Sequence, residues 1–277
     1  MRKYSRLCAT ALAAVVVLIG STPAPAVGGP SGGDRYYLSL GDSLAFGFQR
    51  PKVDAGLPPA AFETGYSNLL AGRLEHGGRP LTLVNYGCPG ESTTTFAAGP
   101  CPWKAAGLPL HDSFIGSQEE AALTFLRSHR GKVDVVTVSL WGNDANAFVA
   151  SCNGNVQCIV DGAPAAIAGI ASNLAGTLGK IHRSAPDATV VVLGAYDANI
   201  GAFPLTHPII RQLNLAMADA AAANRAGFAD PFAVFDPDGD TGAALCVLTL
   251  LCSDGDGHPS DAGYLAIAEL LKRQLGH

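Results

Sequence analysis

Short motifs far apart in the chain contain side chains suited to acyl transfer. Gly41–Leu44 (Gly-Asp-Ser-Leu) places Ser43 directly after the apolar run Tyr36–Leu40, and His258 lies near the C-terminus. A serine at the tip of a buried strand and just before a helix presents its hydroxyl and its backbone N–H, as a nucleophile requires. A histidine held in a loop can accept the hydroxyl proton as general base. We therefore interpret Ser43 and His258 as a nucleophile and its base.

Two more residues could stabilise the oxyanion that forms when a serine attacks an ester. Gly90 lies in Cys88–Ser92 and has no side chain, so its N–H can approach a substrate closely. Asn143 follows the apolar run Val133–Leu140 and offers a side-chain amide. With the Ser43 N–H these groups would supply the donors of an oxyanion hole, and losing one donor typically costs on the order of 3 kcal/mol in the barrier. Each residue alone could be an ordinary cap or turn residue, but their order along the chain favours one site.

The elements that must position these residues alternate between strand-like and helix-like segments. The expected strands are apolar and β-branched: Tyr36–Leu40, Leu81–Asn85, Val133–Leu140, Thr189–Leu193 and Val234–Phe235 with its neighbours. The expected helices are Tyr66–Glu75, Gln118–His129, Pro164–Ser184, Pro208–Ala226 and Ala262–Leu275, the last capped by Ser260. This alternation predicts an α/β fold, a three-layer α/β/α sandwich around a central parallel sheet. Sites in such sheets lie outside the carboxyl ends of the strands.

The N-terminus has the pattern of a secretory signal peptide. Three basic residues within the first six are followed by the apolar stretch Cys8–Gly20, which is too short to span a bilayer comfortably, and by the small residues Ala24–Ala26. We predict cleavage after Ala26, with residues 1–26 as signal peptide and 27–277 as one catalytic domain. An uncleaved membrane anchor is the alternative. The formal net charge is −5, and loss of the three basic residues would leave −8, which argues against nucleic acid or an anionic membrane surface as partner.

Cysteine usage agrees with an oxidising compartment. Six of the seven cysteines lie beyond the predicted cleavage site, and an even number in an exported chain indicates disulfides. Their spacing predicts three local pairs: Cys88–Cys101, Cys152–Cys158 and Cys246–Cys252. Each pair would close a short loop and stabilise the fold by on the order of 2–3 kcal/mol. No Cys-x-x-Cys or His-x-x-x-His spacing is present, so we expect no metal site and no cofactor.

In series, the motifs resemble those of the SGNH/GDSL hydrolase family. Gly41–Leu44 matches its first block, Cys88–Ser92 its second, Gly142–Asp144 its third and His258–Pro259 its fifth. The resemblance runs from about Tyr36 to the C-terminus. It implies a flavodoxin-like α/β/α fold and a metal-free serine esterase whose oxyanion hole is formed by Ser43, Gly90 and Asn143. Three local disulfides in an exported chain further resemble the secreted actinobacterial esterases and lipases of this family.

One position departs from the family pattern. The family commonly has an aspartate three residues before its histidine, where this chain has Gly255. Asp256 is our choice for the residue that orients the imidazole of His258 and stabilises its charged form. Asp254 and a backbone carbonyl remain alternatives. Asp42, beside the nucleophile, is expected to accept backbone N–H groups at its turn.

These observations predict a secreted carboxylic-ester hydrolase that forms an acyl-enzyme on Ser43. Alternatives within the same chemistry are a lipase or phospholipase acting on long acyl chains and an acetyl esterase acting on polysaccharide. A binding protein on the same scaffold is disfavoured, because it would need no nucleophile and base together. The expected partner is a small-molecule or lipid ester, with no nucleic acid, no stable membrane anchor and a monomeric state.

The acyl-chain preference is not fixed by these motifs. Several aromatic side chains near the proposed cleft could form an acyl pocket or could belong to the core: Phe46, Phe48, Trp103, Phe114, Phe148 and Phe203. No long hydrophobic lid segment is evident, which favours an open cleft and short to medium acyl chains.

Overall fold

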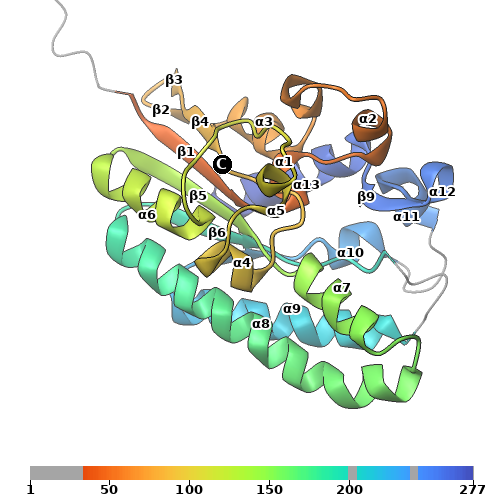
Figure 1. Ribbon diagram of the computed structural model, residues 1–277. Helices are drawn as coiled ribbons and strands as arrows, with labels where there is room; N and C mark the ends of the chain where they lie inside the picture. Colours follow the sequence, from red (N-terminus) through yellow and green to blue (C-terminus); the bar gives the residue numbers. More distant parts are fainter. Residues whose placement is uncertain (1–33, 199–204, 238–242, 277) are drawn as a thin grey trace, which may run out of the picture. The chain divides into compact units, whose positions relative to one another are not determined.

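A computed structural model describes residues 34–198, 205–237 and 243–276 (Figure 1). Its central sheet is parallel, with strand order β4–β1–β5–β6–β7. The strands are β1 (Tyr36–Gly41), β4 (Thr82–Asn85), β5 (Val133–Ser139), β6 (Thr189–Leu193) and β7 (Gly227–Ala229). The predicted signal peptide, residues 1–26, and Phe203 lie outside the described ranges.

Helices cover both faces of the sheet, as expected for a parallel sheet with apolar residues on each face. On one face, side chains such as Val191 and Leu193 pack against α3 (Tyr66–Ala71) and α13 (Asp261–Gln274). On the other, Val190 and Val192 pack against α6 (Gln118–Ser128), α8 (Val156–Ser184) and α9 (Thr206–Ala223). Figure 1 shows α8 and α9 running side by side along this second face. The predicted three-layer α/β/α architecture is confirmed.

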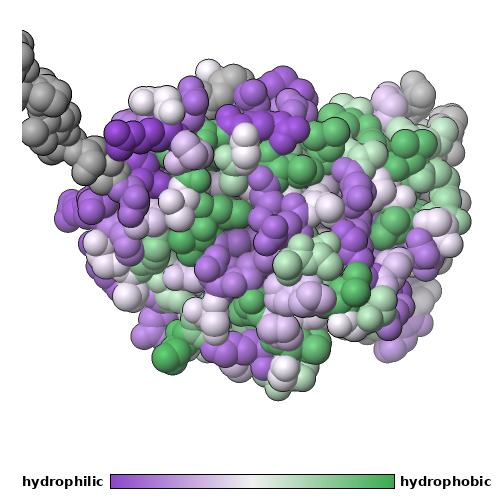
Figure 2. Space-filling view, turned by 90° about the horizontal axis from the view of Figure 1, so that it is seen from above, coloured by the Kyte–Doolittle hydropathy of each residue, from purple (hydrophilic) through white to green (hydrophobic). Residues whose placement is uncertain are grey.

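Shorter elements connect and flank these layers. The short helices are α1 (Ser43–Phe46), α2 (Arg50–Asp54), a 3₁₀ helix (Pro59–Phe62), α4 (Thr93–Ala98), α5 (Pro102–Ala105), α7 (Gly142–Ser151), α10 (Phe232–Phe235), α11 (Ala243–Leu248) and α12 (Leu251–Asp254). Two antiparallel pairs lie outside the main sheet: β2 (Glu75–His76) with β3 (Arg79–Pro80), and β8 (Thr249–Leu250) with β9 (Asp256–Pro259). Figure 2 shows hydrophobic residues scattered among polar ones on one face of the molecule.

Three of the sequence-based elements need correction. The helix predicted at Tyr66–Glu75 ends at Ala71, and Glu75 belongs to β2. The strand predicted at Val234–Phe235 is wrong, because these residues belong to α10, whose first N–H, that of Phe232, donates to the Asp230 side chain at 2.9 Å. The fifth strand is instead β7, a three-residue segment too short to give a clear periodic signal. Helix α8 begins at Val156, earlier than predicted, with the Asn155 side chain accepting the Cys158 N–H and a proline inside the helix.

The structure contains the three predicted disulfides. Cys88–Cys101 joins the loop after β4 to the start of α5, Cys152–Cys158 joins α7 to α8, and Cys246–Cys252 joins α11 to α12. Helix α8 is also long and apolar enough to cross a membrane by length and composition, although in this fold it packs against α6, α7 and α9. Only 22% of its most apolar 18-residue window is buried inside the fold.

Candidate active site

The nucleophile candidate lies at the carboxyl end of β1, the second strand in the order of the parallel sheet. β1 ends at Gly41, and Ser43 begins α1 two residues later. Gly41 has φ +137°, and a Cβ at this position would lie 2.2 Å from the Ser139 carbonyl oxygen, so only glycine fits here. The buried residues Leu44 and Phe46 anchor the short helix in the core. This local structure presents the Ser43 hydroxyl at the sheet edge where sites of parallel sheets lie.

Asp42 caps this turn, as the sequence predicts. Its Oδ1 accepts the Leu44 N–H at 2.9 Å and the Ser139 hydroxyl at 3.3 Å. Burial raises the pKa of Asp42 to about 7, because loss of solvent outweighs the hydrogen bonds and the nearby His258. These contacts assign Asp42 a structural role in the turn.

Ser43, His258 and Asp256 form one continuous hydrogen-bonded series. The Nε2 of His258 lies 2.9 Å from the Ser43 Oγ, and its Nδ1 lies 2.6 Å from Asp256 Oδ1. His258 lies on β9, which ends at Pro259, and the next residue, Ser260, caps α13 by accepting the Gly263 N–H. The arrangement is that of a nucleophile, a base and an orienting carboxylate.

The environment of Asp256 keeps its carboxylate ionised. Its side chain is 1% exposed. Burial alone would raise the pKa of Asp256, but hydrogen bonds from His258 and from the Arg50 N–H, with the charge of His258, lower it to about 2. Asp254 instead is exposed and accepts a hydrogen bond from Ser253 at 2.6 Å. Of the two carboxylates left open by the sequence, Asp256 is the one that contacts the imidazole.

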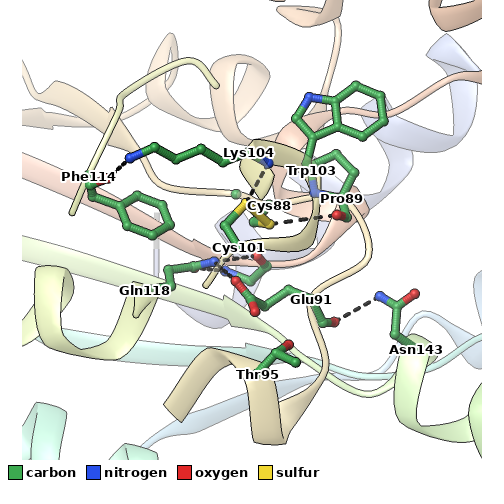
Figure 3. Close-up of a disulfide and its surroundings, with 12 residues drawn as sticks. Cys88, Pro89, Glu91, Thr95, Cys101, Trp103, Lys104, Phe114, Gln118 and Asn143 are labelled. Carbon is green, nitrogen blue, oxygen red and sulfur yellow. Dashed lines mark hydrogen bonds between the residues drawn. A yellow bond between two sulfur atoms is a disulfide. The ribbon is translucent and has the colours of Figure 1, made fainter. Parts of the chain in front are cut away.

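The three candidate oxyanion donors lie on three separate segments of the chain. Ser43 is the first residue of α1, Gly90 lies in the turn after β4, and Asn143 is the second residue of α7. One N–H of the Asn143 side chain donates to the Glu91 carbonyl oxygen at 2.8 Å, and its other N–H can donate to a substrate (Figure 3). Gly90 has φ +87°, a backbone conformation that is strained for residues with a side chain. Within the described residues, neither the Ser43 N–H nor the Gly90 N–H donates a hydrogen bond to a protein group. Both remain available to a substrate oxygen.

A pocket of about 360 Å³ extends from Ser43 and Asn143 between α7, α8 and α9. Its polar lining includes Ser43, Asn143 and His258, together with Asp42, Arg50, Asn146, Asp197, Thr206 and Asp256. Most of the remaining wall is aliphatic or aromatic, including Phe148, Ile159, Ile167, Ile170, Ile210 and Leu213. The α8 members recur at helical spacing, so one face of this helix lines the pocket. The sequence analysis missed this wall, because the same periodicity is typical of an ordinary core face.

The aromatic residues singled out from the sequence divide between core and site. Phe46, Trp103 and Phe114 pack with Phe62 around the first disulfide, in a separate hydrophobic cluster. Phe48 lies against the His258 ring, with 4.4 Å between ring centroids. Phe148 lines the pocket. An acyl pocket built mainly from these aromatics is therefore not present among the described residues.

Solved structures with this fold include several ester hydrolases. An extracellular lipase from Streptomyces rimosus is 20% identical with a TM-score of 0.56, over 87% of this chain and 99% of that one. A phospholipase A1 from Streptomyces albidoflavus NA297 is 18% identical with a TM-score of 0.58, over 87% and 100%. An acetylxylan esterase from Geobacillus stearothermophilus is 17% identical with a TM-score of 0.56, over 88% and 94%.

The sequence comparisons identify the family. No curated protein matches the chain. The sequence pattern of the GDSL-like lipase/acylhydrolase family matches residues 39–266, a stretch that includes all four candidate motifs. The chain thus belongs to the GDSL-like lipase/acylhydrolase family, whose members are carboxylic ester hydrolases.

Proposed function

We propose that this protein is a secreted serine esterase that hydrolyses carboxylic esters through an acyl-enzyme on Ser43. The observation that carries the proposal is the pair of contacts at His258, 2.9 Å to the Ser43 Oγ and 2.6 Å to Asp256. A base that touches both the nucleophile and a buried carboxylate can accept a proton and be stabilised once charged.

The reaction proceeds in two acyl transfers. The Ser43 Oγ attacks the ester carbonyl carbon while His258 Nε2 takes the hydroxyl proton. The N–H groups of Ser43 and Gly90 and the Asn143 amide stabilise the oxyanion. His258 then gives its proton to the departing alkoxide, and the alcohol leaves. Water, deprotonated by His258, attacks the carbonyl carbon of the acyl-enzyme. When the second oxyanion collapses, the bond to the Ser43 oxygen breaks, His258 returns the proton to that oxygen, and the acid leaves.

Export is the second part of the proposal. The N-terminal sequence pattern predicts removal of residues 1–26, and the remaining chain forms three disulfides, which persist in oxidising compartments. An extracellular lipase is among the proteins with the same fold. We infer a catalytic domain of residues 27–277 acting outside the cell as a monomer, without nucleic acid or a membrane anchor.

The pocket favours an aliphatic acyl group over acetyl. A water molecule occupies about 30 Å³ in the liquid, so a pocket of about 360 Å³ has room for an acyl chain considerably longer than acetyl. An acetyl group would leave most of the apolar wall in contact with water. The lipase alternative is thereby favoured for medium acyl chains, and the polysaccharide acetyl esterase is disfavoured.

The experiment is hydrolysis of p-nitrophenyl acetate, butyrate, octanoate and palmitate by the wild-type protein and by Ser43→Ala. We expect activity that the variant abolishes, with a maximum at butyrate or octanoate. Hydrolysis that survives in Ser43→Ala would refute the serine mechanism. Serine-dependent activity confined to acetate would instead favour the acetyl esterase.

A further inference from the structure

Gln118 makes three hydrogen bonds from one fully buried side chain. It lies at the first position of α6 and is 0% exposed. Its Oε1 accepts the Gly41 N–H at 2.7 Å, and its Nε2 donates to the Gly41 carbonyl oxygen at 2.9 Å and to Glu91 Oε2 at 3.2 Å. Because Gly41 ends β1 two residues before Ser43, this glutamine joins the nucleophile turn to the loop that carries Gly90.

Glu91 continues the connection to the third motif. Its backbone carbonyl oxygen accepts the Asn143 side-chain N–H at 2.8 Å, and Figure 3 shows Gln118, Glu91 and Asn143 in succession. The Glu91 side chain is fully buried, and within the described residues its Oε1 has no hydrogen-bond partner. Burial raises the pKa of Glu91 to about 7. A buried carboxyl with an unpaired oxygen costs stability, so its position calls for a reason beyond packing.

We propose that Gln118 and Glu91 are positioning residues that hold the three oxyanion donors in register. Gln118 fixes the peptide group of Gly41 and hence the turn that carries the Ser43 N–H. Glu91 fixes the peptide next to Gly90 and orients the Asn143 amide. The inference rests on the proposed function, because it assigns these two residues to the oxyanion hole of that reaction.

The geometry explains why such a connection would matter. Oxyanion donors must lie 2.7–3.1 Å from the developing charge, and a displacement of about 1 Å can cost 100-fold in rate. The three donors come from separate segments, the start of α1, the turn at Gly90 and the start of α7. The Cys88 N–H donates to the Gly41 carbonyl oxygen at 2.9 Å, and the Asp144 carboxylate accepts the Thr93 N–H at 2.8 Å. The disulfide Cys88–Cys101 tethers one end of the Gly90 turn. The other end of the Gly90 turn is held at Glu91. The Glu91 side chain bonds to Gln118, which contacts the nucleophile turn, and the Glu91 carbonyl oxygen accepts from Asn143.

The test compares kcat and KM for butyrate and octanoate esters in four variants. Gln118→Leu removes all three hydrogen bonds of the glutamine, and Glu91→Leu removes the bond between the two side chains while keeping the Glu91 carbonyl oxygen that accepts from Asn143. In both variants the Gly90 loop loses its side-chain tether to the nucleophile turn, and we expect kcat to fall 10- to 100-fold with KM changed less than threefold. Glu91→Gln keeps an oxygen that can accept from Gln118 and should recover most of the loss seen in Glu91→Leu. Gln157→Leu is the matched control, because the Gln157 side chain is exposed on α8 and donates its hydrogen bond to Asp161, on the same helix.

A loss of activity caused by unfolding must be distinguished from a loss caused by misplaced oxyanion donors. Near-UV circular dichroism and thermal unfolding give the folded fraction, and kcat is expressed per folded molecule. Folded Gln118→Leu and Glu91→Leu proteins with kcat within threefold of wild type would overturn the inference. A loss in Glu91→Leu that Glu91→Gln does not recover would also overturn the role of the Glu91 side chain. A wild-type activity unaffected by Ser43→Ala would refute the proposed function, and this inference with it.

Discussion

The Arg50 backbone N–H donates to Asp256 Oδ2 at 2.8 Å, so the segment after the nucleophile helix holds the carboxylate that orients the base. The neighbouring Gln49 side chain donates to the Pro259 carbonyl oxygen at 3.1 Å, just beyond His258. Two successive residues therefore tether both ends of the short strand that carries the histidine. Nucleophile and base come from opposite ends of the chain, and these bonds set their distance.

Replacing Asp256 should damage catalysis far more than replacing Asp254. Asp256→Asn keeps the shape of the side chain but removes the charge that stabilises protonated His258, and we expect kcat to fall roughly 10²- to 10⁴-fold. Asp254→Asn is the matched control, because Asp254 is exposed and bonds to Ser253. Steady-state kinetics on one ester decide the question. Similar losses in the two variants would contradict the assignment of Asp256.

The stability of Glu91→Gln should depend on pH in a direction that the wild-type pKa sets. Burial raises the pKa of Glu91 from 4.5 to about 7, so between these values the unfolded chain loses a proton that the folded protein keeps. Wild-type stability therefore decreases as pH rises through this window, and the glutamine variant lacks that decrease. We expect the Tm of the variant to exceed that of wild type by roughly 3–6 °C at pH 8 but not at pH 4. A Tm difference independent of pH would argue against a protonated Glu91.

Filling the apolar pocket should shift acyl-chain preference. Ala166 lines the pocket on α8, whereas Ala168 is exposed on the same helix. In Ala166→Phe, kcat/KM for octanoate should fall by roughly tenfold or more relative to acetate, since the larger ring occupies acyl space. Ala168→Phe should keep the wild-type profile. An unchanged ratio in Ala166→Phe would place the acyl chain elsewhere.

Gly90→Ala should lower kcat beyond what backbone strain explains. The residue has φ +87°, and a Cβ would lie 3.3 Å from the Pro102 Cβ, so the loop must shift and move the N–H. We expect kcat to fall roughly 10- to 1000-fold with little change in KM. Gly107→Ala provides the control, because Gly107 has φ +80° with nothing within 4 Å of the added carbon. Equal kcat values for the two variants, after correction for stability, would remove Gly90 from the oxyanion hole.

The sequence predicted the main layers of the fold because β4, β5 and β6 contain β-branched residues and β1 is a largely apolar run between loop residues. The strand prediction at Val234–Phe235 was wrong, because a short apolar run is compatible with either a helical turn or a strand. Tertiary contacts determine which of the two forms. β7 contains a glycine and an alanine, which give little strand signal.

Most residues of the candidate site could be selected from the sequence, but the choice between two carboxylates and the role of Gln118 could not. Ser43, Gly90, Asn143 and His258 stand out in the sequence because each follows a strand or precedes a helix. The choice between Asp254 and Asp256 depends on Gly255, whose φ of +64° turns the chain so that only one carboxylate contacts the imidazole. Gln118 gave no sequence signal, because a glutamine in the first turn of a helix is ordinarily a solvated residue.

The most direct measurement is mass spectrometry of the protein quenched in acid during turnover of a p-nitrophenyl ester. We expect an added acyl mass on the peptide that contains Ser43 in the wild-type protein and no such mass in Ser43→Ala. In His258→Ala the acylated fraction should increase if deacylation slows more than acylation. An acyl group on another residue, or turnover with no acylated peptide at any quench time while Ser43→Ala remains active, would contradict an acyl-enzyme on Ser43.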